Sequence, residues 1–199
     1  AALDELAAAL DVAGTALRRA SADGAEGDAE ATAPTRSGRA GSSGRPRRTP
    51  VRLARGAIDG TAEATDQLLR TPGVAVVVDG YNVSMSAWPR LDARTQRDHL
   101  VKLLGAASAR TGADVHVVFD GDSATEAERR PSVSAPLAVR VHYSAADVEA
   151  DDVVIAMARD LPTDRPVVVV SSDRRVAEGA RRHGANVVSS SALLAWVRA

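Results

Sequence analysis

Three aspartates in this chain of 199 residues each follow a run of apolar residues. Asp79 comes directly after VAVVV, Asp120 comes after VHVVF, and Asp173 follows VVVV and two serines. Such continuous apolar runs are typical of strands that are buried on both faces of a parallel sheet. The carboxyl ends of parallel strands lie at one edge of an open sheet, which is where ligands bind. The sequence therefore predicts that these carboxylates gather at one edge.

The pairs Asp79-Gly80 and Asp120-Gly121 have a second interpretation, because Asp-Gly is a strong signal for a β-hairpin turn. A hairpin requires another strand directly after the glycine. The residues that follow, YNVSMSAWP and DSATEAERRP, contain turn formers and a proline and show no strand alternation. Each pair is therefore predicted to close a strand and open a loop. For a single aspartate, a helix N-cap or a turn is the competing structural role.

A fourth acidic cluster, Glu149, Asp151 and Asp152, is predicted at the start of a helix. Carboxylates that lie close together repel one another, and they either take up protons or bind a cation. The chain has no cysteine, and its four histidines lack metal-ligand spacing. Oxygen ligands alone favour Mg²⁺ or Mn²⁺, and such ions promote the attack of water on a phosphodiester.

The elements that would position these acids alternate along the chain. Apolar runs occupy residues 74–78, 115–119, 138–142, 167–170 and 186–188. Amphipathic segments of helical length occupy residues 92–110, 149–160, 174–183 and 191–198. This alternation predicts one α/β domain over residues 74–199, with a mostly parallel sheet covered on both faces.

The residues before this domain fall into three segments. Residues 1–20 place leucines and an alanine at heptad positions, which predicts a helix, either the end of a coiled coil or a surface for a protein partner or self-association. Residues 21–50 are small and polar without periodicity and are predicted to be a disordered linker. Residues 51–73 include a lead-in helix that ends at Thr71-Pro72-Gly73.

The linker and the lead-in also carry a run of arginines without acidic neighbours. These are Arg36, Arg39, Arg45, Arg47, Arg48, Arg52 and Arg55. A basic tether of this kind adds salt-sensitive affinity for a polyanion, and the competing interpretation is a solubilising linker.

The composition restricts the class of protein. Basic and acidic side chains are nearly balanced, 25 against 26, and no apolar run approaches the roughly 18 residues that a membrane span requires. We therefore expect a cytoplasmic protein that does not enter a membrane. Arginine far outnumbers lysine and alanine is abundant, as in proteins from GC-rich bacterial genomes.

The motifs, taken in order, resemble the NYN domain, a family within the PIN-like nucleases. They are VVVDGYN (76–82), QRDHLVKLL (96–104), VVFDG (117–121), ADD (150–152), SSD (171–173) and GANVVSS (184–190). Residues 52–73 are also similar to the segment that precedes this domain in bacterial members. The resemblance covers residues 74–199 and implies a three-layer α/β/α fold and metal-dependent endoribonuclease activity on RNA.

The resemblance also implies roles for particular residues. Asp79, Asp120, Asp151 and Asp173 match the acids that hold Mg²⁺ or Mn²⁺, Asp152 matches a supporting acid, and Asn82 matches a residue that orients a ligand or water. Tyr81, Arg97, Ser171 and Ser172 are expected to contact the substrate. For Tyr81 the alternative is packing, and for Arg97 it is a solvated helix face.

Two features depart from the family pattern. Glu149 stands where many members have a small hydroxyl residue, and it is either an additional ligand or a change to the site. The segment 122–136 is long and is interpreted as a substrate-contacting flap or as a loop. The alternative function for the whole chain is a non-catalytic RNA-binding adaptor with the same fold.

Overall fold

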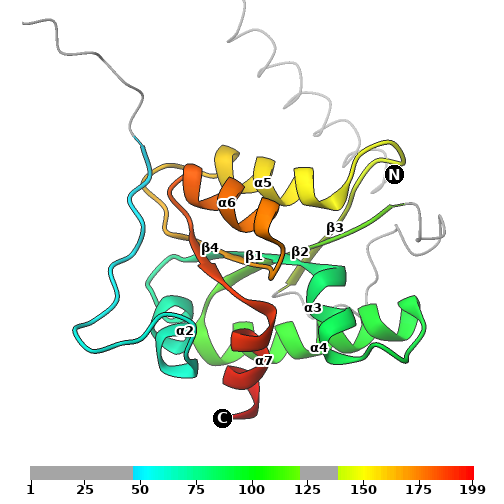
Figure 1. Ribbon diagram of the computed structural model, residues 1–199, viewed down its shortest axis with the longest axis horizontal. Helices are drawn as coiled ribbons and strands as arrows, with labels where there is room; N and C mark the ends of the chain where they lie inside the picture. The colour runs from blue at the N-terminus through cyan, green and yellow to red at the C-terminus, as the bar shows by residue number, and fades with distance from the viewer. Residues whose placement is uncertain (1–46, 122–138) are drawn as a thin grey trace, which may run out of the picture. The chain divides into compact units, whose positions relative to one another are not determined.

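The computed structural model describes residues 47–121 and 139–199. The predictions for residues 1–46 and for the segment 122–136 lie outside these residues. In chain order the described elements are α2 (Ala62–Leu69), β1 (Ala75–Asp79), α3 (Gly80–Ala87), α4 (Ala93–Thr111), β2 (Asp114–Phe119), β3 (Val139–Tyr143), α5 (Ala150–Asp160), β4 (Val167–Val170), α6 (Arg174–Arg182), β5 (Asn186–Val188) and α7 (Ser190–Arg198). Figure 1 shows their arrangement.

The five described strands form one parallel sheet in the order β3-β2-β1-β4-β5. Strand β1 is central, and its Val78 lies beside Val117 of β2 and Val170 of β4. Asp79, the last residue of β1, therefore lies at the middle of the edge formed by the carboxyl ends of the strands. We call this edge the carboxyl rim.

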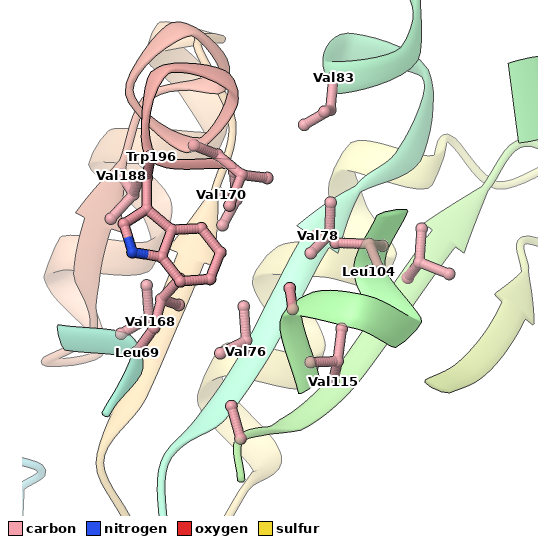
Figure 2. Packing of buried hydrophobic residues seen from close by; sticks show 14 of the residues in the cluster. Leu69, Val76, Val78, Val83, Leu104, Val115, Val168, Val170, Val188 and Trp196 are labelled. Atoms are coloured by element: carbon pink, nitrogen blue, oxygen red, sulfur yellow. The ribbon is translucent and has the colours of Figure 1, made fainter. Parts of the chain in front are cut away.

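Helices cover both faces of the sheet. Helices α2, α3, α4 and α7 lie on one face, and α5 and α6 lie on the other (Figure 1). In Figure 2, Trp196 of α7 and Leu69 of α2 pack beside Val168 on the first face. On the second face, Ala75 and Val77 belong to the cluster under α5 and α6. Burial on both faces accounts for the continuous valine runs, and the predicted three-layer α/β/α fold is confirmed.

The prediction of a loop after Gly80 is wrong, because residues 80–87 form helix α3. Asp79 is the N-cap of this helix, and its side chain accepts a hydrogen bond from the backbone N–H of Asn82. A Cβ on Gly80 would lie 2.4 Å from a ring carbon of Phe119, so only glycine lets the helix begin this close to β2. The Asp-Gly pair thus joins a strand directly to a helix.

Residues 47–60, which we call the strap, run beside the edge strand β5. Arg48 is buried, and its guanidinium donates hydrogen bonds to the carbonyl oxygens of Leu161 (2.7 Å) and His183 (3.0 Å), just beyond the ends of α5 and α6. A cation at helix C-termini is favourable because the carbonyls there carry partial negative charge. The Asn186 side chain accepts from Val51 N–H (2.7 Å) and donates to Val51 C=O (2.9 Å). The strap is therefore fixed to the domain.

No described helix has the length and apolar character that crossing a membrane requires.

Candidate active site

Asp79 is the most enclosed acid of the carboxyl rim, with 4% of its surface exposed. Its Oδ2 accepts a hydrogen bond from Ser171 Oγ (2.8 Å), and its Oδ1 accepts one from the backbone N–H of Asn82 (3.2 Å). Burial raises the pKa of Asp79, these two hydrogen bonds oppose the rise, and the nearby charges of Asp151 and Asp173 add to it. Asp79 is therefore oriented by its partners and is costly to ionise.

Asp173 and Asp151 lie near Asp79 at the starts of α6 and α5. Asp173 is the N-cap of α6 and accepts from Val176 N–H (3.0 Å), while its own N–H donates to Ser171 Oγ (3.0 Å). Asp151 lies in the first turn of α5. Burial raises the pKa of Asp151, and the charge of Asp173 raises it further. Asp151 and Asp173 thus lie close enough for their charges to act on Asp79.

Arg175 of α6 is the cation beside this group, and the sequence reading missed it. It forms ion pairs with Glu149 (2.5 Å), Asp151 (3.7 Å) and Asp152. Glu149 is the N-cap residue of α5, but its side chain makes no capping hydrogen bond and instead pairs with Arg175. The pairs depend on the packing of α5 against α6, and no local motif signals them.

Asn82 connects three elements of the rim. Its Oδ1 accepts hydrogen bonds from Ser172 N–H (2.8 Å) and from Ser190 Oγ (2.6 Å). Ser172 Oγ in turn accepts from Ser190 N–H (3.0 Å). Asn82 therefore holds the end of β4 and the start of α7 against α3. Its predicted role in orienting a ligand or water stays a prediction.

Tyr81 and Arg97 contact each other between α3 and α4. Arg97 is only 5% exposed and donates a hydrogen bond to the Tyr81 hydroxyl (2.8 Å). The Tyr81 and Phe119 rings meet in a T-shaped contact, with the ring centroids 5.5 Å apart. Arg97 thus does not lie on a solvated helix face. The predicted contacts of both residues with substrate stay predictions.

The donor chemistry of the rim suits a hard divalent cation, because its acids are oxygen ligands and neighbouring carboxylates raise the pKa of Asp79 and of Asp151. Asp120 directly follows β2, the neighbour of β1, at the same rim. Within residues 47–121 and 139–199, however, no three acidic or histidine side chains are grouped closely enough to hold a metal ion. The structure places Asp151 and Asp173 where their charges act on Asp79, and Arg175 pairs with Asp152.

Residues 76–199 match the model of the YacP-like NYN domain, and the chain belongs to this family, one of ribonucleases. Two similar solved structures are crystal structures of Rae1 (YacP) from Bacillus subtilis, one of them of a single-substitution mutant. Both are 28% identical to this chain, and each match covers 62% of it. The match spans 73% of the unsubstituted Rae1 chain with a TM-score of 0.52. It spans 74% of the mutant chain with a TM-score of 0.51. No curated protein shows significant similarity to the chain.

Proposed function

We propose that this chain is a metal-dependent endoribonuclease that hydrolyses RNA phosphodiester bonds at the carboxyl rim. The observation that carries the proposal is the buried carboxylate of Asp79, whose pKa is raised by burial and by the charges of Asp151 and Asp173. Asp79 and Asp173 cap helices, but capping does not require Asp151 and Asp173 to lie where their charges oppose the ionisation of Asp79. Perturbed groups of this kind gather at functional sites.

The residues that would hold Mg²⁺ or Mn²⁺ are Asp79, Asp151 and Asp173, with Asp120 and Asp152 as further ligands. Because no three described acids are grouped closely enough to hold an ion, these side chains would have to move closer together to bind it. Nucleases of the NYN family generally use divalent metals. When bound, such an ion activates water and stabilises the leaving oxygen of the phosphodiester. Binding of a cation would also relieve the repulsion among the carboxylates, so the same acids that destabilise the empty rim would favour the metal.

The other rim residues orient this acid group. The Ser171 hydroxyl and the Asn82 N–H each hold one oxygen of Asp79, so both oxygens have a fixed direction. Ser171 also accepts from Asp173 N–H, which links two of the acids through one hydroxyl. The Asn82 side chain holds Ser172 and Ser190 in place. We infer that these contacts preorganise the carboxylates for the reaction.

The test is cleavage of a labelled structured RNA, such as a tRNA, by the purified chain in Mn²⁺, in Mg²⁺ and in excess chelator. We expect metal-dependent cleavage that falls about 100-fold or more in Asp79→Asn and Asp151→Asn, the scale for removing one electrostatic group from an active site. Asp160→Asn is the matched control, because Asp160 is exposed at the other end of α5 from Asp151. RNA binding by each variant is measured in parallel.

Cleavage that persists in chelator, or an Asp79→Asn variant as active as the unchanged chain, would contradict the proposal. Binding of RNA without cleavage in any metal would favour the RNA-binding adaptor instead.

A further inference from the structure

A hollow of about 280 Å³ opens beside the carboxyl rim, and we call it the strap hollow. Its lining includes Asp59 and Gly60 of the strap, Ser171 and Ser172 after β4, Arg181 of α6 and Ser189 before α7. It adjoins the candidate active site directly, because Ser171 donates to Asp79 and the Ser172 N–H donates to Asn82.

The side chains around the strap hollow suit a polar, negatively charged ligand. Arg181 is exposed, and the described ion pairs of α6 engage Arg174 and Arg175 at the start of the helix. The Ser172 hydroxyl oxygen accepts a hydrogen bond from Ser190 N–H, so its hydrogen is directed elsewhere and can be donated to a ligand. The Asp59 carboxylate is exposed and only accepts hydrogen bonds when ionised.

The size and surroundings of the strap hollow restrict the ligand further. Its volume is just below the roughly 300–1,000 Å³ of pockets for small molecules, which suits one nucleotide unit better than a large cofactor. Exposed arginines lie nearby in the chain, on the strap and at the end of α6: Arg47, Arg52, Arg55 and Arg182. Arg47 reaches the Arg182 carbonyl oxygen (3.5 Å), so the two basic segments are adjacent. Such a surface attracts a polyanion.

We propose that the strap hollow binds one nucleotide of the RNA next to the scissile bond. Arg181 pairs with its phosphate, and Asp59 accepts a hydrogen bond from its ribose 2′-hydroxyl. This inference rests on the proposed function and adds a substrate subsite to it. Asp59 and Gly60 precede residues 76–199, so the upstream strap completes a wall that the matched family domain does not itself supply.

The first test measures binding of a labelled single-stranded RNA to the Asp79→Asn chain, in which the RNA stays intact, at several salt concentrations. Arg181→Ala should weaken binding about tenfold or more, as expected for loss of a hydrogen bond to a charged group. It should also lower the salt slope of log K by about 0.7. Arg182→Ala, which makes the same charge change on the next residue of α6, should weaken binding less than twofold. Equal weakening by both would overturn the proposal, because it would indicate diffuse attraction.

The second test uses Asp59→Ala with RNA and with DNA of the same sequence. If the surface acted only through its net charge, removing an acid would tighten the binding of any polyanion. The proposal instead predicts that Asp59→Ala weakens RNA binding several-fold and leaves DNA binding unweakened, since DNA lacks the 2′-hydroxyl. Tighter RNA binding, or equal weakening for RNA and DNA, would overturn the role of Asp59.

Cleavage by the unchanged chain separates the two proposals. If it cuts RNA and Arg181→Ala behaves like Arg182→Ala, the subsite is wrong and the nuclease proposal stands. If it cuts nothing in any metal, while Arg181→Ala alone weakens binding, the nuclease proposal fails and the hollow remains an RNA-binding site.

Discussion

The pKa of an aspartate is lowered at one end of the central sheet, where Asp114 is half-buried, and raised at the other end, where Asp79 is buried. At the amino end, Asp114 begins β2 and pairs with Arg140 and with Arg165 (2.7 Å). Burial alone would raise the pKa of Asp114, but the hydrogen bond from Arg165 and the positive charges of His116, Arg140 and Arg165 leave it lowered. At the carboxyl rim, burial and neighbouring acids raise the pKa of Asp79.

The difference is between a carboxylate whose charge stabilises the fold and one whose charge the fold disfavours, although Asp79 also caps α3. Asp114 is stabilised as an anion, so its ionised form adds to the free energy of unfolding. Asp79 and Asp151 are disfavoured as anions, so their ionisation subtracts from it. An acid kept at a cost to stability points to a role in binding or catalysis, and the opposite end of the same sheet shows the arrangement that stability alone favours.

The largest effect on stability should come from Asp114→Ala. Losing charged hydrogen bonds costs about 1.5–3 kcal/mol. In a domain of this size 1 kcal/mol corresponds to roughly 2–4 °C in Tm. Because the pKa of Asp114 is lowered in the fold, its contribution is present at neutral pH and is lost as the pH falls through that pKa. Thermal unfolding at several pH values measures both effects, and RNA cleavage should be unchanged.

Asp164→Ala is the control for this prediction, because Asp164 is exposed and directly precedes Arg165. If the Tm of Asp114→Ala equals that of Asp164→Ala, the charge of Asp114 does not stabilise the fold, and the contrast with Asp79 fails.

The sheet could be predicted from the sequence because its strands are continuous apolar runs. Each of the five runs overlaps an observed strand, so the acids after β1, β2 and β4 could be assigned to one rim. Helix α3 could not be predicted, since Gly80, Asn82 and two serines are weak helix formers. It forms because Asp79 caps it and because Val83 and Ser84 are buried in the packed domain.

The parts of the site that the sequence could not predict depend on contacts between distant elements. Arg175 is one arginine among several on α6, and only the packing of α5 beside α6 places it at Glu149 and Asp152. Arg48 belongs to a basic run that the sequence predicts as a tether, yet it is buried just beyond the ends of α5 and α6. The same run therefore contains both the buried Arg48 and exposed arginines such as Arg52. Composition alone cannot distinguish the buried arginine from the exposed ones.

A smaller effect on Tm is expected from Arg175→Ala, which removes the arginine that pairs with the acids of the carboxyl rim. In chelator the Tm should fall, but less than in Asp114→Ala, because the ion pairs of Arg175 are partly exposed to water. Added Mn²⁺ should reduce the deficit, since a bound cation would neutralise the same acids. Arg174→Ala is the control, because the Arg174 side chain is 92% exposed and, among the described residues, its ion pair is with Glu178 at 3.7 Å. If Mn²⁺ does not raise the lowered Tm of Arg175→Ala, the metal does not bind at these acids.

The most direct test of the central claim is the thermal stability of Asp79→Asn in chelator between pH 4 and pH 8. Asparagine is also a good N-cap, so the substitution preserves the start of α3. The raised pKa of Asp79 means that its protonated form is the more stable one, and that stability is lost as the pH rises through the pKa in the fold. Asp79→Asn should therefore have a higher Tm than the unchanged chain at pH 8, and the two should converge toward pH 4. A variant that is less stable at every pH would show that Asp79 supports the fold, and would contradict the claim that the rim keeps its acids for chemistry.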